Sequence, residues 1–311
     1  MRFAVLGSGS KGNALVVQGG GVTVLVDAGF SPRELKRRMQ ALDLALTDLR
    51  ALVVTHGHSD HVKGARALAG ALGIPTFATD GTRRFCARFG ALHNHEPVLP
   101  GEPFTIGGLT VQALATSHDA AGSVCFVVDD GDERLGVCTD LGEPSDEIAR
   151  GLAECRALLL EHNHDLEMLR SGPYPMHLKR RIASARGHLS NEQGAALLSA
   201  VRRPQLSRVL LGHLSEVNNT PALALAAARP ELDGADVELA CAPQHHPTGW
   251  LRVQRERKSG AALAARLVAT APVAQPTASA PAPPLRTGQH RALEAQLALF
   301  ATKAQSTRST R

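Results

Sequence analysis

The run His56-Gly57-His58-Ser59-Asp60-His61 constrains what this 311-residue chain can fold into more than any other feature. It follows the apolar, strand-like residues 51–54 and precedes a helical pattern over residues 62–72. Histidine and aspartate are ligands suited to Zn²⁺, Mn²⁺ or Fe. One ion cannot easily take four side chains packed this closely, so the pattern favours two ions, with His56 and His58 on one and Asp60 and His61 on the other. A plain polar loop or a histidine tract is the alternative.

Three more ligand-type residues each follow an apolar, strand-like segment. His118 comes after residues 109–114, Asp140 after residues 135–138 and His213 after residues 209–211. Each alone would be an ordinary loop residue, but together with the histidine run they predict one metal-binding site. The tetrapeptide Gly-His-Leu-Ser occurs twice, around His188 and His213. His213 is preferred as the ligand, because a strand-like segment leads directly into it.

Strand-like and helical segments alternate over the first 255 residues, which predicts an α/β (α+β) domain. The strand-like segments are residues 2–6, 14–18, 22–26, 51–54, 109–114, 124–128, 135–138, 157–160, 209–211, 237–240 and 250–253. The helical segments are residues 33–39, 62–72, 82–89, 178–185, 191–201 and 222–228. The helix from residue 191 has a readable start, because Ser190 and Gln193 fit a capping box.

Composition divides the chain into three parts. Residues 1–255 are expected to form one domain, followed by an Ala/Pro-rich linker over 256–289 and a short helix with a disordered basic tail over 290–311. The net charge of +5 comes from the end of the chain: residues 251–311 hold 10 basic and 2 acidic residues, whereas the first 250 hold 24 and 27. The overall basic charge therefore does not by itself predict nucleic-acid binding.

The five cysteines are scattered and form no C-x-x-C pair. This argues against a disulfide framework and against a cysteine-based zinc site, and a reducing cytoplasm is the expected location. No apolar segment approaches the roughly 20 residues of a membrane span, and the N-terminus lacks a signal-peptide pattern. We therefore expect no membrane association.

The segment Gly7-Ser8-Gly9-Ser10-Lys11-Gly12 fits the G-x-G-x-x-G pattern of dinucleotide-binding folds. Such a fold needs a helix that starts at this loop, so that its N-terminus meets the pyrophosphate. A strand-like run follows instead, over residues 14–18. The segment is therefore expected to be a hairpin connection, and it can also border the active site.

In chain order, over about residues 1–255, these motifs resemble the metallo-β-lactamase-fold hydrolases. Asp27, in Leu-Val-Asp-Ala-Gly, matches the first motif of that superfamily, and the histidine run matches the second. His118, Asp140 and His213 match the third, fourth and fifth. The resemblance implies a four-layer αββα sandwich with two divalent metal ions, Zn²⁺ or Mn²⁺, at one edge.

The resemblance also implies two sets of three ligands joined by the bridging carboxylate of Asp140. The two sets are His56, His58 and His118 for the first ion, and Asp60, His61 and His213 for the second. Asp27 would orient a ligand histidine. Hydroxide held between the ions would attack a phosphorus in line. Oxygen-reducing di-iron relatives carry an acidic residue in place of His58, so this histidine favours hydrolysis over redox chemistry.

A finer resemblance is to the YycJ (WalJ) group of that superfamily, whose members are 5′→3′ exonucleases on double-stranded DNA. The stretches that carry it are residues 7–13, 117–120, 160–165, 172–175, 178–182, 187–191 and 213–220. His162 departs from the group, because a small residue is expected there in the Glu-x-Asn-His-Asp motif. The Ala/Pro-rich linker and the basic tail also lie outside the pattern.

Three further residues are candidates for roles beside the ligands. His188 or His164 would protonate the departing 3′-oxygen, with Asp60 counted among the catalytic groups. His188 also precedes a helix start, where free N–H groups favour a phosphate. Glu161 would belong to the network that orients these groups. Plain structural roles remain open for His188, His164 and Glu161.

Two groups of basic residues are candidates for contacts with DNA phosphates. Lys179, Arg180, Arg181 and Arg186 form the first, just before His188, and Arg83, Arg84 and Arg88 form the second. Either group can equally be a solvated helix face. Aromatic residues are only 3% of the chain, so a stacking platform for unpaired bases is poorly supplied. Backbone contacts with double-stranded DNA, with little sequence preference, are the favoured partner interaction.

Two alternatives to an exonuclease belong to other classes. The same metal pair could serve a hydrolase of a small thioester, lactone or cyclic phosphodiester. A binding protein that keeps the fold without turnover is disfavoured by the intact ligand set. The basic residues before His188 and the YycJ-like stretches favour the nuclease. The sequence indicates no protein partner.

Overall fold

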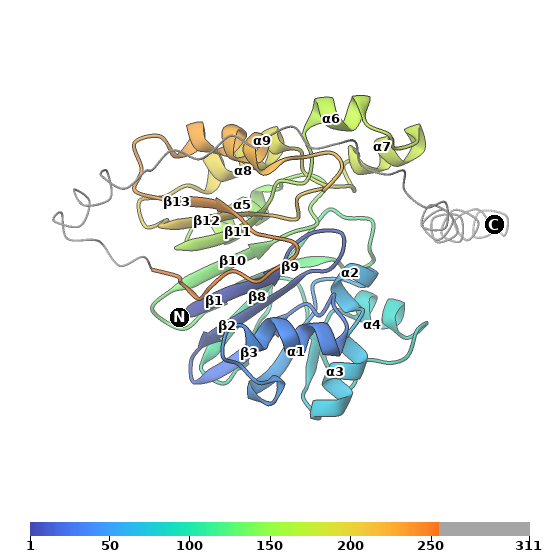
Figure 1. Ribbon diagram of the computed structural model, residues 1–311. Helices are drawn as coiled ribbons and strands as arrows, with labels where there is room; N and C mark the ends of the chain where they lie inside the picture. Colours follow the sequence, from blue (N-terminus) through green and yellow to red (C-terminus); the bar gives the residue numbers. More distant parts are fainter. Residues whose placement is uncertain (255–311) are drawn as a thin grey trace, which may run out of the picture. The chain divides into compact units, whose positions relative to one another are not determined.

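The computed structural model describes residues 1–254, and two seven-stranded sheets form its centre (Figure 1). The first sheet has the order β14-β1-β2-β3-β4-β5-β6. Its strands are β1 (Arg2–Gly7), β2 (Ala14–Gly19), β3 (Val22–Val26), β4 (Leu49–Val53), β5 (Thr76–Ala78), β6 (His95–Pro97) and β14 (Leu251–Arg252). Pairing is antiparallel from β14 to β3 and parallel from β3 to β6.

The second sheet repeats this plan, with the order β13-β12-β11-β10-β9-β8-β7. Its strands are β7 (Pro103–Ile106), β8 (Leu109–Ala115), β9 (Val124–Asp129), β10 (Arg134–Cys138), β11 (Ala157–Glu161), β12 (Arg208–Gly212) and β13 (Glu238–Cys241). Pairing is antiparallel from β7 to β10 and parallel from β10 to β13.

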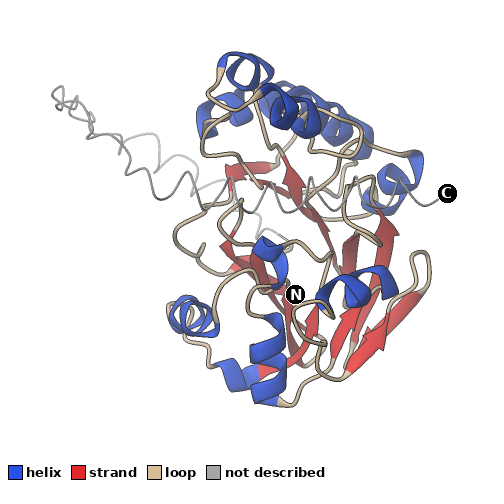
Figure 2. Ribbon diagram, turned by 90° about the vertical axis from the view of Figure 1, so that its right-hand side faces the viewer, coloured by secondary structure: helices blue, strands red, loops and turns tan. Residues whose placement is uncertain are grey.

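Helices cover the outer face of each sheet, which makes four layers (Figure 2). On the first sheet lie α1 (Pro32–Gln40), α3 (Ala65–Leu72) and α4 (Asp80–Cys86), whose apolar side chains pack on Leu6 and Leu25. On the second lie α5 (Asp146–Leu152), α8 (Asn191–Val201) and α9 (Pro221–Ala228), packed on Leu158 and Leu160. The remaining helices are α2 (Ser59–Val62), α6 (Leu166–Ser171), α7 (Met176–Ile182), η1 (Leu46–Asp48) and η2 (Arg229–Leu232).

The central core lies between the two sheets, and the strands that form it are buried on both faces. In β1, Phe3 and Val5 face the other sheet, while Ala4 and Leu6 face the helices. A strand buried on both faces is apolar throughout rather than alternating. This explains why the sequence segments read as continuous apolar runs. The predicted αββα sandwich is confirmed.

The helix predicted over residues 62–72 is wrong in its extent. The chain forms α2 and α3 instead, because the backbone N–H of Gly64 donates to the carbonyl oxygen of Ala28 at 2.7 Å rather than continuing a helix. The helix predicted over 191–201 and its capping box are confirmed in α8. Strands β5, β6 and β7 and helices α5 and α6 were not predicted. All five are short, so their periodicity is weak.

The linker predicted over residues 256–289 and the helix and tail predicted over 290–311 lie outside the described residues. Within residues 1–254, no helix combines the length and the apolar character that crossing a bilayer requires. The chain from β1 to β2 is a hairpin connection, as predicted for the glycine-rich segment. The dinucleotide fold is thereby excluded for this segment.

Candidate metal centre

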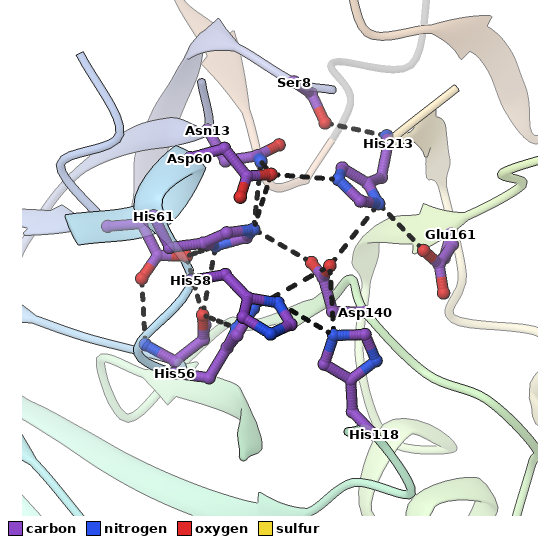
Figure 3. Close-up of polar contacts among 12 residues, drawn as sticks. Ser8, Asn13, His56, His58, Asp60, His61, His118, Asp140, Glu161 and His213 are labelled. Carbon is purple, nitrogen blue, oxygen red and sulfur yellow. Dashed lines mark hydrogen bonds and ion pairs between the residues drawn. The ribbon is translucent and has the colours of Figure 1, made fainter. Parts of the chain in front are cut away.

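The candidate ligands lie in loops that leave the carboxyl ends of strands in both sheets. The loop after β4 carries the histidine run, whereas His118, Asp140 and His213 follow β8, β10 and β12. In sheets of this kind the carboxyl ends of neighbouring parallel strands form one edge, where ligands bind. Figure 3 shows the side chains from these separate loops pointing toward one another.

Among the described residues there are four candidate metal-binding groups, and the predicted ligands other than Asp140 make up two of them, each with one nitrogen or oxygen per residue within 4.8 Å of the others. These two groups are His56, His58 and His118, and Asp60, His61 and His213. These are the two sets that the resemblance implies. All these side chains are buried except His58 and Asp60, whose side chains are 22% and 21% exposed. The site is therefore open to solvent on the side of these two residues.

The carboxylate of Asp140 lies between the two groups. Its Oδ1 is 3.9 Å from Nε2 of His56 and 3.8 Å from Nε2 of His118. Its Oδ2 is 3.1 Å from Nε2 of His61. Oδ1 is also 3.6 Å from Nδ1 of His213, so the carboxylate lies close to histidines of both groups.

Four of the histidines direct Nδ1 at an oxygen of the surrounding protein. Nδ1 of His61 is 2.7 Å from Asp27, and Nδ1 of His213 is 2.9 Å from Glu161. Nδ1 of His118 is 2.8 Å from the carbonyl oxygen of Gly187, and Nδ1 of His56 is 3.0 Å from Oγ1 of Thr55. When Nδ1 donates to such an oxygen, Nε2 is left with its lone pair free for a metal.

The residues present fit divalent metal ions. Nε2 of His56 and Nε2 of His213 are buried and have no hydrogen-bond partner among the described residues. Buried polar atoms without partners are rare in proteins. Nε2 of His56 lies 3.9 Å from Oδ1 of Asp140, and Nε2 of His213 lies 3.6 Å from Oδ2 of Asp60. Imidazole nitrogens with carboxylate oxygens make up the usual ligand set of Zn²⁺ and Mn²⁺.

Burial and neighbouring charges shift the pKa values of several candidate ligands. Burial alone would lower the pKa of His213, but Asp140, Asp60 and Glu161 outweigh it and raise that pKa to about 10. Burial lowers the pKa of His58 to about 4, with a further contribution from His118. The pKa of Asp140 lies well below its usual value despite burial, because histidines surround the carboxylate. Asp140 is therefore ionised at neutral pH.

Three of the site residues have left-handed backbone conformations. The φ angles are 60° at Asp27, 61° at Asp140 and 56° at His213. Asp27 and His213 directly follow a strand and Asp140 comes two residues after one, so each turn directs a side chain into the site. Such conformations of non-glycine residues cost on the order of 1 kcal/mol or more and concentrate at functional sites.

A family model described as a beta-lactamase superfamily domain matches residues 22–214. The chain belongs to the metallo-β-lactamase superfamily. Among curated relatives, exodeoxyribonuclease YycJ of Bacillus anthracis is 35% identical over 227 residues, which are 72% of this chain and 86% of that protein. Exodeoxyribonuclease WalJ of Streptococcus pneumoniae serotype 2 (strain D39) is 32% identical over 242 residues, 76% of this chain and 90% of that protein. The resemblance to the YycJ (WalJ) group is confirmed.

Solved structures agree with the fold. The metallo-beta-lactamase fold protein YhfI from Bacillus subtilis has a TM-score of 0.61 at 17% identity, covering 79% of this chain and 98% of that one. Zn²⁺-bound PqqB from Methylobacterium extorquens has a TM-score of 0.60 at 18% identity, covering 80% and 99%. With its fold, its candidate ligands and its YycJ and WalJ relatives, the chain is a metal-dependent hydrolase.

The structure separates the two candidate proton donors of this metallo-β-lactamase-fold hydrolase. His188 is partly exposed, and its ring centroid is 5.0 Å from that of His118 and 5.1 Å from that of His213. His164 is fully buried, neither ring nitrogen has a hydrogen-bond partner among the described residues, and burial lowers its pKa to about 4. The geometry therefore favours His188 as the donor.

Glu161 is the residue that holds His188 and His213 together. Its Oε1 lies 2.9 Å from Nδ1 of each histidine, and its Oε2 accepts from the backbone N–H groups of Leu141 and Leu189. Burial alone would raise the pKa of Glu161, but His188 and His213 outweigh it and lower that pKa to about 2. Of the two histidines in the repeated tetrapeptide, His213 lies with Asp60 and His61, whereas His188 is part of a further candidate group with Asp140, Glu161 and His213.

The predicted DNA-contacting residues differ in their distance from the site. Nε of Arg181 is 2.5 Å from Asp119, whose other oxygen is 3.3 Å from His58. The guanidinium of Arg186 lies 3.4 Å from the carbonyl oxygen of His118. Lys179 instead donates to the carbonyl oxygen of Arg170, and Arg180 is exposed on α7. Only Arg181 and Arg186 are thus in contact with the residues of the site.

Four residues with contacts to the site were not predicted individually. Oγ of Ser8 accepts from the backbone N–H of His213 at 2.8 Å, and Nδ2 of Asn13 lies 3.0 Å from Nε2 of His61 and 3.3 Å from Oδ2 of Asp60. Thr55 and Asp119 are the other two. The glycine-rich segment was the available signal for Ser8 and Asn13, because a loop bordering the active site was the functional alternative to a plain hairpin connection there.

Proposed function

We propose that this protein is a 5′→3′ exonuclease that hydrolyses phosphodiester bonds in double-stranded DNA with two divalent metal ions. The observation that carries the proposal is the placement of Asp140, whose carboxylate lies 3.9 Å from His56 of one triad of candidate ligands and 3.1 Å from His61 of the other. The YycJ and WalJ relatives, named exodeoxyribonucleases, support the substrate.

The first ion would be held by His56, His58 and His118, and the second by Asp60, His61 and His213, with Asp140 shared. When bound, such ions supply Lewis-acid activation of a water nucleophile and neutralise charge on the phosphate. Zn²⁺ and Mn²⁺ both suit these ligands. Asp27 and Glu161 keep His61 and His213 oriented with Nε2 toward the centre.

His188 is the proposed proton donor to the departing 3′-oxygen. Its Nδ1 faces Glu161, so its Nε2 remains for a leaving group on the exposed side. His164 has no such carboxylate contact and no exposure.

Phosphates next to the cleaved one would meet Arg181 and Arg186, and Lys179 and Arg180 would meet phosphates farther along the strand. Contacts of this type recognise the DNA backbone and carry little sequence preference. Each one adds about one unit to the slope of log affinity against log salt concentration. Binding of duplex DNA is therefore expected to weaken steeply with salt.

A reducing compartment, the cytoplasm, is the proposed location. All five cysteines are free thiols, and four of them are buried. Persisting free thiols are typical of proteins from reducing compartments.

The decisive experiment is digestion of duplex DNA by purified protein loaded with Mn²⁺ or Zn²⁺. Duplexes labelled at the 5′ or the 3′ end show the polarity of digestion, and a single-stranded RNA and a small thioester test for other substrates.

From duplex DNA we expect immediate release of the 5′ label as mononucleotide and gradual shortening of the 3′-labelled strand. Asp60→Ala should abolish digestion, whereas Asp132→Ala, an exposed aspartate on the turn between β9 and β10, should not. Rapid thioester cleavage with intact DNA would overturn the proposal.

The donor assignment has its own test. His188→Gln should lower kcat by about 10²-fold or more while keeping both metal equivalents. His164→Gln should leave kcat unchanged. Loss of one metal equivalent in His188→Ala, with none lost in His213→Ala, would reverse the assignment of the two histidines.

A further inference from the structure

An exposed aromatic surface lies beside the candidate metal centre, formed by Phe85 on α4, Phe89 just after α4, and the guanidinium of Arg88. Phe89 is 73% exposed, more than any other large apolar side chain among the described residues. The ring centroids of Phe85 and Phe89 are 5.9 Å apart, and the guanidinium carbon of Arg88 lies 5.3 Å from the Phe85 centroid. We call these three residues the α4 aromatic surface.

This surface is joined to the ligand loop by direct contact. Gly57 stands between the candidate ligands His56 and His58, and the Phe85 ring packs against its backbone. A Cβ at Gly57 would lie 2.5 Å from Cδ1 of Phe85, so only glycine permits this approach. Phe89 is therefore separated from the ligand loop by a single aromatic ring.

Charge on the surface suits a polyanion. Arg83 and Arg84 each pair with Asp80, whereas no acidic side chain pairs with Arg88 among residues 1–254. An exposed aromatic ring beside a guanidinium is the combination that single-stranded nucleic acid uses, because the ring stacks on a base and the cation meets a phosphate.

From these contacts we propose that the α4 aromatic surface stacks a base of the DNA strand held at the metal centre, with Arg88 on an adjacent phosphate. The inference rests on the proposed nuclease function and identifies the part of the substrate that this surface contacts. Since a paired base offers no free face within a duplex, the stacked base is one of the first nucleotides at the 5′ end, where the duplex frays. The low aromatic content predicted no such platform, but the fold gathers two of the eight phenylalanines at one place.

The test compares two kinds of duplex. The first kind lacks one base, at the first, second or third nucleotide from the 5′ end, and the second kind, the fully based duplex, has a base at every position. For the wild-type enzyme, one of these abasic positions should lower kcat/KM about tenfold, the scale of one base–aromatic stack. Phe89→Ala should show that loss on the fully based duplex and no further loss on the abasic one. Phe89→Trp should restore the wild-type pattern.

Matched controls separate stacking from folding and from charge. Leu99→Ala removes another exposed apolar side chain, which is 56% exposed. It should change kcat/KM neither on the fully based duplex nor on the abasic duplexes. Arg88→Ala should reduce the salt slope of binding by about one unit, whereas Arg203→Ala, on the loop after α8, should not. All variants should keep the wild-type metal content.

The outcomes are distinguishable. A wild-type enzyme that digests DNA and is equally fast on every abasic duplex overturns the stacking inference alone. Equal rates for wild type and Phe89→Ala on the fully based duplex do the same. A wild-type enzyme that leaves all DNA intact overturns the proposed function and the stacking inference together.

Discussion

Asn13 connects the glycine-rich segment to both members of one candidate ligand pair. Its Nδ2 lies 3.0 Å from Nε2 of His61 and 3.3 Å from Oδ2 of Asp60, and its Oδ1 accepts from the backbone N–H of Gly9 at 2.8 Å. The backbone N–H of Asn13 donates to the carbonyl oxygen of Asp60 at 2.7 Å. Asn13 is thus a positioning residue for the Asp60 loop.

Asn13→Ala is expected to weaken binding of one metal equivalent by about 10- to 100-fold, because partners that orient ligands have effects of that size. The measurement is a metal titration followed by calorimetry. Ser10→Ala, an exposed position in the same segment, is the control and should bind as wild type does. Equal affinity in both variants would contradict the positioning role.

His162 is a buried histidine that departs from the YycJ pattern. Neither of its ring nitrogens has a hydrogen-bond partner among the described residues, and its ring packs on Gly194 of α8, where a Cβ would lie 2.7 Å from the ring carbon Cε1. Burial lowers the pKa of His162 to about 4. The folded state therefore keeps this ring neutral at pH values where the unfolded chain protonates it.

The pKa of His162 in the folded state lies below the unfolded value of about 6.5. Above pH 6.5 the ring is neutral in both states, so it costs no free energy of unfolding. As the pH falls toward 4, only the unfolded chain takes up the proton, so the free energy of unfolding decreases. From pH 7 to pH 5 this histidine is expected to cost about 2 kcal/mol of the free energy of unfolding. Denaturant unfolding with a chelator present should show that His162→Ser removes this part of the pH dependence. His177→Ser, an exposed histidine on α7, should not remove it. An identical pH dependence in both variants would exclude the effect.

At the scale of elements, helix α8 links the capping of a helix to the chemistry of the site. Oγ of Ser190 accepts from the backbone N–H of Gln193 at 3.2 Å, and the Gln193 side chain accepts from the backbone N–H of Ser190 at 2.9 Å. The preceding Leu189 donates its N–H to Glu161. The start of α8 therefore holds the segment that carries His188.

Ser190→Ala is expected to lower the free energy of unfolding by about 1 kcal/mol, the usual cost of losing an N-cap. It should also lower kcat, because the cap positions the segment that carries His188. Ser145→Ala removes the equivalent cap of α5, where Oγ accepts from the N–H of Ile148 at 3.2 Å, and should cost similar stability without affecting kcat. Equal effects of the two substitutions on kcat would show that α8 only contributes stability.

The long elements were predictable and the short ones were not. Strands such as β1 and β11 are buried on both faces, so their apolar runs are visible in the sequence. Strands β5 and β6 have three residues each, and their pairing depends on neighbouring parallel strands rather than on their own composition. The division of one predicted helix into α2 and α3 depends on a hydrogen bond to Ala28, which lies far away in the sequence.

At the scale of the whole molecule, the candidate centre joins the two sheets. Asp60 and His61 follow a strand of the first sheet, whereas Asp140 and His213 follow strands of the second. An ion bound by groups from both sheets stabilises the folded state alone, since the unfolded chain does not hold these groups together.

Removal of metal by a chelator is expected to lower Tm by about 5–10 °C, because occupancy at 100 times Kd contributes about 2.7 kcal/mol. Addition of Zn²⁺ or Mn²⁺ in excess should restore both Tm and activity in a thermal scan. Asp60→Ala should show a smaller shift, since one set of ligands is incomplete. A Tm that does not respond to the chelator would contradict a metal site between the sheets.

The candidate ligands could be proposed from the linear chain, because each lies in a loop that follows an apolar run and is of a type that binds metal. The position of Asp140 close to both groups of candidate ligands, the contacts of Ser8 and Asn13, the burial of His164 and the aromatic surface of α4 could not be predicted. All of these depend on loops that are distant in sequence and meet only when the two sheets pack together. Local patterns record which strands and helices form, whereas the contacts between separate loops follow from how those elements pack.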